Sequence, residues 1–352
     1  MIAVICISLA ALVAALAVVL LVLSPGTMPA PAGKDGISEK VFVEIGGVRQ
    51  GMFLRGADTG NPVLLYVHGG PGMPTYFLAE KTAAPLEESF TVCYWEQRGA
   101  GLSWSADMDP SAITTEQLVD DTIEVAAYLS ERFGQEKVLL VGHSWGSYIA
   151  IQAAEKAPER FSAYVGIAQV SDTARAGEIA WQYLIDRYEE EGNEKRLAAL
   201  RALPAVTTDE GAYAFFNAPI RETAQHELGV GSTHEMRSVV TGIFFPQLAC
   251  RAYTLPEKVA FWRAKAFLRK ETKLGDEVFA ANLFEEVPRL EVPAYFMSGA
   301  YDYTVPWELS QEYLEALEAP DKGFYLFEDS AHSPIFEEPE RFAEVLQEVA
   351  KP

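Results

Sequence analysis

The sequence predicts an α/β fold in which helices cover both faces of a mostly parallel sheet. Short apolar runs typical of buried strands alternate with amphipathic runs typical of helices. The alternation stops after residue 170 and resumes at 291, and an uncharged apolar stretch opens the chain. We therefore expect five parts: an N-terminal membrane or signal segment (1–23), a tether (24–36), a core in two pieces (37–170 and 291–352) and an inserted helical cap (171–290).

The N-terminal stretch is long enough to cross a membrane. Residues 1–23 contain no charged side chain, and at about 1.5 Å per residue they match a hydrocarbon core of roughly 30 Å. Ala30-Pro31-Ala32 offers a signal-peptidase site, but no basic residue precedes the apolar run. We expect a retained transmembrane helix with the rest of the chain outside the cytoplasm; secretion after cleavage is the alternative. Residues 24–36, rich in Pro, Gly and Ala, are typical of a tether.

The core is predicted from its strand and helix patterns in order. Apolar runs rich in Val, Ile, Leu and aromatic residues predict strands at 41–45, 52–54, 63–68, 90–95, 138–142, 164–170, 294–298 and 324–327. Helical periodicity predicts helices at 115–133, 148–156, 307–317 and 340–350. Helices between successive strands indicate crossovers, so most of these strands are expected to run parallel.

Composition excludes some functions. The 352 residues carry a net charge of −22 and no basic patch, which argues against nucleic acid as a partner. The three cysteines lie far apart without metal-binding spacing, and a chain of this length needs no disulfide framework. The pairs His226-Glu227 and His234-Glu235 also lack the H-E-x-x-H spacing of a zinc site. We therefore predict no metal and no other cofactor.

The segment Gly142-His-Ser-Trp-Gly146 predicts a nucleophile. It matches G-x-S-x-G between a predicted strand and a predicted helix. Glycines two positions before and after the serine leave room for a tight corner, which exposes the Ser144 hydroxyl at the positive end of a helix.

A serine nucleophile needs a base and an acid that orients the base. If the chain order is Ser, acid, His, the base is His332, the only histidine after Asp302. Asp302 follows the strand 294–298 through a turn at Gly299, which places it at the same sheet edge as Ser144. Other candidates for the acid are Asp172, Asp321 and Asp329.

Attack on a carbonyl also requires donors for the developing oxyanion. The glycine-rich loop His68–Pro74 follows a strand and presents backbone N–H groups without side chains. Pro71 has no N–H, so Gly69, Gly70 and Gly72 are the candidates, of which we choose Gly70. The second predicted donor is the backbone N–H of Trp145.

These motifs resemble a known family. His68-Gly-Gly-Pro-Gly72, "EQRGAGLS" (96–103), "GHSWGS" (142–147), "SGAYD" (298–302) and "SAHSP" (330–334) occur in the order seen in α/β-hydrolases of the proline iminopeptidase type. The resemblance implies an α/β-hydrolase fold, a triad of Ser144, Asp302 and His332, and release of N-terminal residues from small peptides. The family usually has Asp before Gln-Arg-Gly, where this chain has Glu96.

The resemblance also implies cap carboxylates that hold the free amine of the substrate. The family places them near a Trp-x-x-Trp-Glu pattern, and this chain has only Trp181 in the corresponding segment. The candidates here are Glu178, Asp186, Glu189 and Glu190. Residues 171–290 contain 18 Asp and Glu against 15 Lys and Arg, a net charge of −3, so the acidity of the chain is not concentrated in the cap.

The sequence thus predicts a serine hydrolase that acts through an acyl-enzyme on a small molecule or short peptide. An aminopeptidase is the first expectation, with proline as the first residue to try. A carboxylesterase or lactonase with the same triad is an alternative, and a non-catalytic binding protein on the same scaffold is another.

Overall fold

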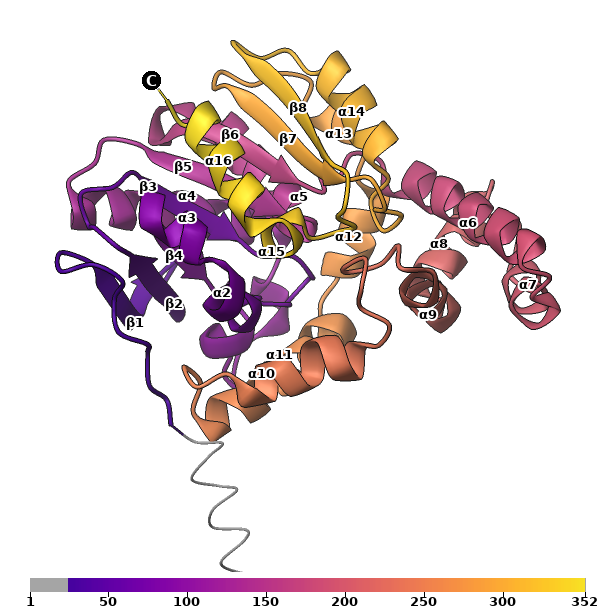
Figure 1. Ribbon diagram of the computed structural model, residues 1–352, viewed down its shortest axis with the longest axis horizontal. Helices are drawn as coiled ribbons and strands as arrows, with labels where there is room; N and C mark the ends of the chain where they lie inside the picture. The colour runs from indigo at the N-terminus through magenta and orange to yellow at the C-terminus, as the bar shows by residue number, and fades with distance from the viewer. Residues whose placement is uncertain (1–24, 352) are drawn as a thin grey trace, which may run out of the picture.

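A computed structural model describes residues 25–351 as an eight-stranded sheet with helices on both faces (Figure 1). The strand order is β1-β2-β4-β3-β5-β6-β7-β8. β1 (Ile37–Ile45) and β2 (Val48–Gly56) form an antiparallel hairpin, and β2 is also antiparallel to β4. Every other pairing in the sheet is parallel. The predicted fold class, a mostly parallel sheet between helices, is confirmed.

The parallel strands bring the candidate site residues to one edge. They are β3 (Val63–Val67), β4 (Thr91–Trp95), β5 (Val138–His143), β6 (Phe161–Ile167), β7 (Ala294–Gly299) and β8 (Lys322–Phe327). β3 to β7 are almost entirely buried, as their continuous apolar runs require. Because they run parallel, the loops after β3, β5, β7 and β8 all leave at the same edge of the sheet.

Two sets of helices cover the two faces of the sheet. α4 (Thr115–Phe133), α5 (Trp145–Lys156) and α14 (Trp307–Ala316) pack into one apolar core. α2 (Tyr76–Thr82), α3 (Ala84–Ser89) and α16 (Pro339–Val349) pack into the other. α4 has the predicted ends because the Thr114 side chain caps its first turn and Gly134, at φ 66°, ends it. α2 and α3 have no counterpart among the helices expected from the sequence.

Between β6 and β7 the chain is helical and forms two groups. The first contains α6 (Thr173–Glu190), α7 (Glu194–Arg201), α8 (Asp209–Asn217) and α9 (Pro219–Leu228), which share a small apolar core of their own. The second contains a π-helical turn η4 (Val240–Phe244), α10 (Phe245–Ala249) and α11 (Leu255–Glu271), and packs against α2 through Phe77 and Phe261. α12 (Leu274–Ala280) and α13 (Leu283–Glu286) lead back to the sheet. Figure 1 shows the two groups at different places along the sheet.

The predicted membrane segment, residues 1–23, lies outside the described residues. Within residues 25–351 no helix has the length and apolarity needed to cross a bilayer. The tether lies against the second helical group, where the Thr27 N–H donates to the Arg251 carbonyl. Lys40 on β1 forms an ion pair with Glu257 on α11 at 2.8 Å. The start of the described chain is therefore held beside α10 and α11.

Candidate active site

Ser144 occupies a strained corner between β5 and α5. Its backbone has φ 54° and ψ −124°, an unfavourable conformation for a residue with a side chain. The glycines around Ser144 are required because a larger side chain would collide with the backbone. A Cβ on Gly146 would lie 2.0 Å from the Val67 carbonyl oxygen, and one on Gly142 would lie 2.6 Å from the Gly146 carbonyl oxygen. A Cβ on Gly69 would come within 3.2 Å of the Ser144 Cβ, so the glycine-rich loop lies directly against the serine.

Asp302 and His332 are hydrogen-bonded to each other. The Asp302 carboxylate is fully buried, and its Oδ2 lies 2.8 Å from His332 Nδ1. Its other oxygen accepts backbone N–H groups of Thr304 and Val305 at 2.8 and 2.9 Å, which fixes the carboxylate. Because Asp302 binds Nδ1, the orientation of the imidazole ring is fixed and Nε2 faces away from this carboxylate.

The competing acids lie elsewhere. The Asp172 side chain accepts the Arg175 backbone N–H at 3.0 Å and caps α6. Asp321 accepts the Tyr295 hydroxyl at 2.7 Å, and Asp329 lies exposed in the turn after β8. Of the four candidates, the structure places only Asp302 at His332.

The buried side chain of His143 contacts the backbone of the loop that contains His332. His143 precedes the serine, and its Nε2 lies 2.8 Å from the His332 carbonyl oxygen, while its Nδ1 lies 3.0 Å from the Tyr66 hydroxyl. Burial lowers the pKa of His143 to about 3, with a further contribution from His332. The neutral ring therefore donates through Nε2 to the carbonyl and accepts from Tyr66.

The Glu337 side chain also binds the backbone of the His332 loop. This contact was not predicted from the sequence. The carboxylate accepts the backbone N–H groups of Ala331 and Ser333, which flank His332, at 3.0 and 3.1 Å. It also accepts the His234 N–H at 2.6 Å. Burial raises the pKa of Glu337 to about 7, although these three bonds oppose the shift. The sequence "SAHSPIFE" (330–337) contains the feature that could have indicated this contact, an acidic residue five positions after His332.

Gln97 connects the glycine-rich loop to the serine corner. Its side-chain N–H donates to the His68 carbonyl at 2.6 Å, and its side-chain oxygen accepts the Trp145 indole N–H at 3.2 Å. Its backbone N–H donates to His68 Nε2 at 3.2 Å, and His68 Nδ1 lies 2.7 Å from the Gly69 carbonyl. Burial lowers the pKa of His68 to about 4, so the ring is neutral at neutral pH.

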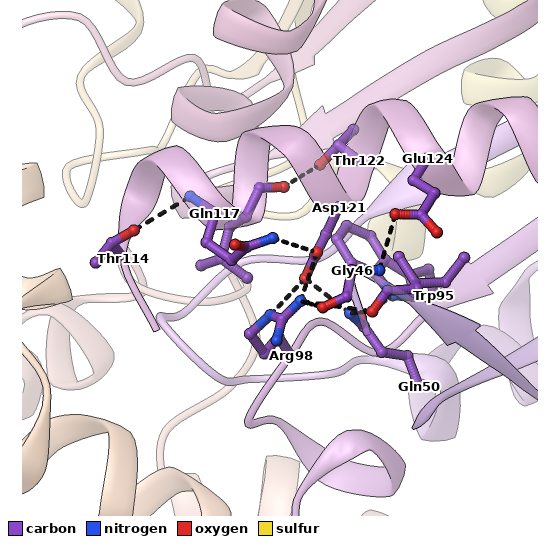
Figure 2. Close-up of polar contacts among 11 residues, drawn as sticks. Gly46, Gln50, Trp95, Arg98, Thr114, Gln117, Asp121, Thr122 and Glu124 are labelled. Carbon is purple, nitrogen blue, oxygen red and sulfur yellow. Dashed lines mark hydrogen bonds and ion pairs between the residues drawn. The ribbon is translucent and has the colours of Figure 1, made fainter. Parts of the chain in front are cut away.

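A buried ion pair anchors the segment that carries Gln97. Arg98 forms two bonds of 2.7 Å to the carboxylate of Asp121 on α4, and both side chains are almost fully buried. Figure 2 shows Gln50 and Gln117 donating to the same carboxylate, at 2.7 and 2.9 Å. Arg98 also donates to the Gly46 carbonyl at 2.9 Å. With its charge and lone pairs satisfied, the pair forms a fixed base for Gln97.

Glu96, the departure from the family pattern, joins the core to the cap. Its carboxylate accepts the Leu102 N–H at 2.5 Å and the hydroxyl of Tyr253, which precedes α11. The side chain is buried, and this burial raises the pKa of Glu96 to about 7. Glu96 therefore connects the segment that contains Gln97 to the second helical group through hydrogen bonds.

A cavity of about 170 Å³ opens beside the serine. Its floor contains the two predicted oxyanion donors, Gly70 and Trp145, together with Ser144. The rest of the lining comes mainly from the first helical group and from the loop after β7: Val170, Ser171, Asp172, Thr173, Ala176, Gly177, Ala180, Phe216, Arg221, Val278, Thr304 and Val305. Cap residues thus form part of the wall of the cavity beside the serine.

The structure does not bring the four predicted cap carboxylates to this cavity. All four are exposed on α6, and none lines the cavity. Asp186 accepts from Gln182, Glu189 pairs with Arg201, and Glu190 pairs with Arg187. The face of α6 that reaches the cavity instead carries Thr173, Ala176, Gly177 and Ala180, following Asp172. The free-amine role of Glu178, Asp186, Glu189 and Glu190 stays a prediction without a structural contact to support it.

The C-terminal part of α9 and the segment that follows it contact both loops of the candidate triad. Gln225 donates to the Tyr303 carbonyl, next to Asp302, at 2.5 Å, and the His332 N–H donates to the Gly231 carbonyl at 3.2 Å. His226 lies 3.1 Å from the Ser232 hydroxyl, and His234 lies 2.8 Å from the Gly229 carbonyl. These histidines therefore shape the segment that links the cap to the site.

The comparisons with known proteins agree with this architecture. The family of the α/β hydrolase fold matches residues 62–339. A probable aminopeptidase, YbaC of Bacillus subtilis (strain 168), is 35% identical over 326 residues, which cover 90% of this chain and 98% of the relative. A proline iminopeptidase of Clostridium botulinum is 27% identical and covers 83% of this chain and 90% of its own.

Solved structures show the same fold. A proline iminopeptidase-related protein from Thermus thermophilus aligns with a TM-score of 0.62 at 21% identity, over 89% of this chain and 98% of that one. The resemblance to the proline iminopeptidase type is thereby confirmed at the level of relatives and fold. Because the family match spans most of the chain, the protein belongs to the α/β-hydrolase family and is a hydrolase.

Proposed function

We propose that the chain is a serine aminopeptidase that releases N-terminal residues, proline first, from short peptides. The observation that carries the proposal is the buried Asp302–His332 hydrogen bond at the sheet edge where Ser144 lines a cavity. The names of the relatives, probable aminopeptidase and proline iminopeptidase, support the substrate class.

The reaction follows from these groups. His332 takes the Ser144 proton through Nε2 as the oxygen forms a bond to the substrate carbonyl carbon, and Asp302 stabilises the imidazolium. The backbone N–H groups of Gly70 and Trp145 bind the oxyanion. The C–N bond then breaks, the imidazolium gives its proton to the leaving amine, and the acyl group remains on Ser144. Water activated by His332 hydrolyses this ester and restores the serine.

The substrate's ammonium needs a carboxylate inside the cavity, since an unpaired buried charge is costly. Among the residues that the structure describes, Asp172 is the only carboxylate that lines this cavity. One of its oxygens caps α6, and the other is available to an amine. We assign the amine contact to Asp172 in preference to the exposed carboxylates of α6.

A hydrolysis screen tests the proposal. The full chain is assayed on prolyl and alanyl anilides, on the same anilides after N-acetylation, and on a simple acetate ester. Turnover of the free-amine anilides with loss of activity after acetylation is expected. Equal rates on free and acetylated anilides, or turnover of the ester alone, would favour the carboxylesterase or lactonase alternative.

A further inference from the structure

The cavity beside Ser144 contains a cation, Arg221, that forms no direct ion pair among the described residues, although Glu222 and Asp302 lie near enough to act on its charge. Arg221 on α9 lines this cavity, donates to the Phe216 carbonyl at 3.2 Å and lies over the Phe216 ring at 5.0 Å. Within residues 25–351 it forms no ion pair. Burial lowers the pKa of Arg221 to about 10, so the guanidinium still carries its charge at neutral pH.

A second polar group in the same cavity also lacks a partner. Ser171 is buried, with 2% of its surface exposed, and its hydroxyl has no hydrogen-bond partner among the described residues. An unsatisfied hydroxyl and an unpaired guanidinium are both costly to bury. Both are donors, and a carboxylate is the acceptor that satisfies them together.

We propose that Arg221 and Ser171 bind a carboxylate of the substrate, so that the enzyme prefers short substrates that end in a free carboxylate. The inference rests on the proposed function for the scissile bond, and it names the substrate class. Asp172 and Arg221 are the only charged side chains that line the cavity among the described residues. With Asp172 on the amine and Arg221 on the carboxylate, a cavity of about 170 Å³ suits a dipeptide.

The test compares matched substrates that differ only in the terminal charge. Prolyl-alanine is compared with its C-terminal amide, and O-butyryl-lactate with O-butyryl-lactamide, so that the carboxylate belongs to the leaving group in both pairs. The wild-type enzyme is expected to favour the carboxylate member of each pair by about tenfold or more in kcat/KM, the worth of a charge-assisted hydrogen bond. Arg221→Met is expected to remove this preference, Arg221→Lys to keep part of it, and Ser171→Ala to weaken it.

The outcomes separate this inference from the proposed function. If the wild-type enzyme cleaves both members of each pair equally, the carboxylate site is overturned and the peptidase assignment stands. If only the esters are cleaved but O-butyryl-lactate is preferred over its amide and Arg221→Met removes that preference, the carboxylate site stands and the aminopeptidase falls. The wild-type comparison decides the question even if a variant does not fold, which thermal melting of each variant reveals.

A different observation points to a membrane contact. Four exposed apolar side chains, Val240, Phe244, Phe245 and Val259, lie on η4, α10 and α11 and are 38% to 54% exposed; we call them the apolar patch. Phe244 contacts Phe245 and also Trp262 of α11, with ring centroids 5.5 and 5.4 Å apart, so aromatic side chains connect η4 and α10 to α11. Such a patch on a soluble surface marks an interaction site.

The surroundings of the patch identify the partner. Residues 240–271 contain six Lys and Arg against two Glu, a net charge of +4 in a chain of −22, and five of the six basic side chains are at least partly exposed, whereas Lys258 is buried. The described chain begins beside the same helices, where Thr27 bonds to Arg251, and the sequence before it is the uncharged apolar stretch 1–23. Figure 1 shows this start next to α10 and α11. Apolar side chains among basic ones suit an anionic bilayer surface.

We infer that the apolar patch inserts into the headgroup region of the membrane.

An environment-sensitive fluorophore tests this contact. It is attached at Phe245→Cys in the full chain with Cys6→Ser, and the matched control is Glu315→Cys on α14. Both are placed in vesicles of phosphatidylcholine and phosphatidylglycerol with brominated acyl chains. We expect a blue shift and quenching at position 245 only. No quenching at 245, or equal quenching at both positions, overturns the inference. Sedimentation as a dimer without quenching assigns the patch to a second copy instead.

Discussion

The side-chain oxygen of Gln97 accepts a hydrogen bond from the indole nitrogen of Trp145 at 3.2 Å. The same side chain donates to the carbonyl of His68, at the start of the loop that contains Gly70. One amide therefore ties together the two backbone segments that are proposed to bind the oxyanion, and the Arg98–Asp121 pair fixes its position.

Gln97→Ala is expected to lower kcat by about tenfold to a hundredfold with little change in KM, because misplaced donors weaken stabilisation of the transition state. The loss should be similar for peptide and ester substrates. Gln182→Ala, on the exposed side of α6, is the matched control. A variant that changes KM alone would show that Gln97 shapes substrate binding instead.

Asp302→Asn is expected to lower kcat by about 10³- to 10⁴-fold, since an amide cannot stabilise the imidazolium or hold its tautomer. Asp172→Asn keeps the cap of α6, because Asn caps as well as Asp, and should chiefly raise KM for free-amine substrates. Measuring kcat and KM of both variants on the same free-amine anilide distinguishes the effect of Asp302→Asn from that of Asp172→Asn. A severe kcat defect at Asp172 with a mild one at Asp302 would reverse the assignment.

Glu337→Gln is expected to lower kcat by about tenfold or more, because the amide N–H₂ faces backbone donors and displaces the His332 loop. The rate at which a fluorophosphonate phosphonylates Ser144, with loss of fluoride, should fall in parallel, a readout that a change in stability alone does not produce. Glu340→Gln, an exposed position in α16, serves as the control. Unchanged phosphonylation in a folded Glu337 variant would contradict the positioning role.

Glu96 is expected to make the fold less stable as the pH rises. Its pKa is raised from 4.5 to about 7, so between these values the folded chain holds a proton that the unfolded chain has released. The free energy of unfolding contributed by this group therefore falls from pH 4.5 to pH 7. The buried neutral histidines contribute with the opposite sign, so the wild type is compared with Glu96→Gln by denaturant titration across this range. Parallel pH profiles would contradict the prediction.

The sequence predicted the elements whose local patterns are strong. The helix 115–133 has its predicted ends because Thr114 and Gly134 are local capping signals. The corner at Ser144 follows from glycine spacing, and the structure brings Asp302 to His332 in the predicted chain order. Strand ends moved by a few residues, as at β6, which is Phe161–Ile167 where 164–170 was expected.

Features that depend on tertiary packing were not predictable. α2 and α3 are seven and six residues long, too short for a clear period of 3.6. The sequence did not show whether the four predicted cap carboxylates on α6 face the cavity. The packing of α6 decides which of its faces reaches the cavity. The roles of Arg221, Gln97 and Glu337 depend on loops that are far apart in the sequence and meet only in the fold.

The central claim is that Ser144 is the nucleophile, and covalent labelling tests it most directly. The full chain is treated with a fluorophosphonate, digested and mapped by mass spectrometry. We predict one adduct, on the peptide that contains Ser144 and not on the one that contains Ser171, the other serine in the cavity, with labelling abolished in a folded Ser144→Ala variant. Labelling that persists in that variant, or an adduct on any other residue of the wild-type chain, would contradict the account.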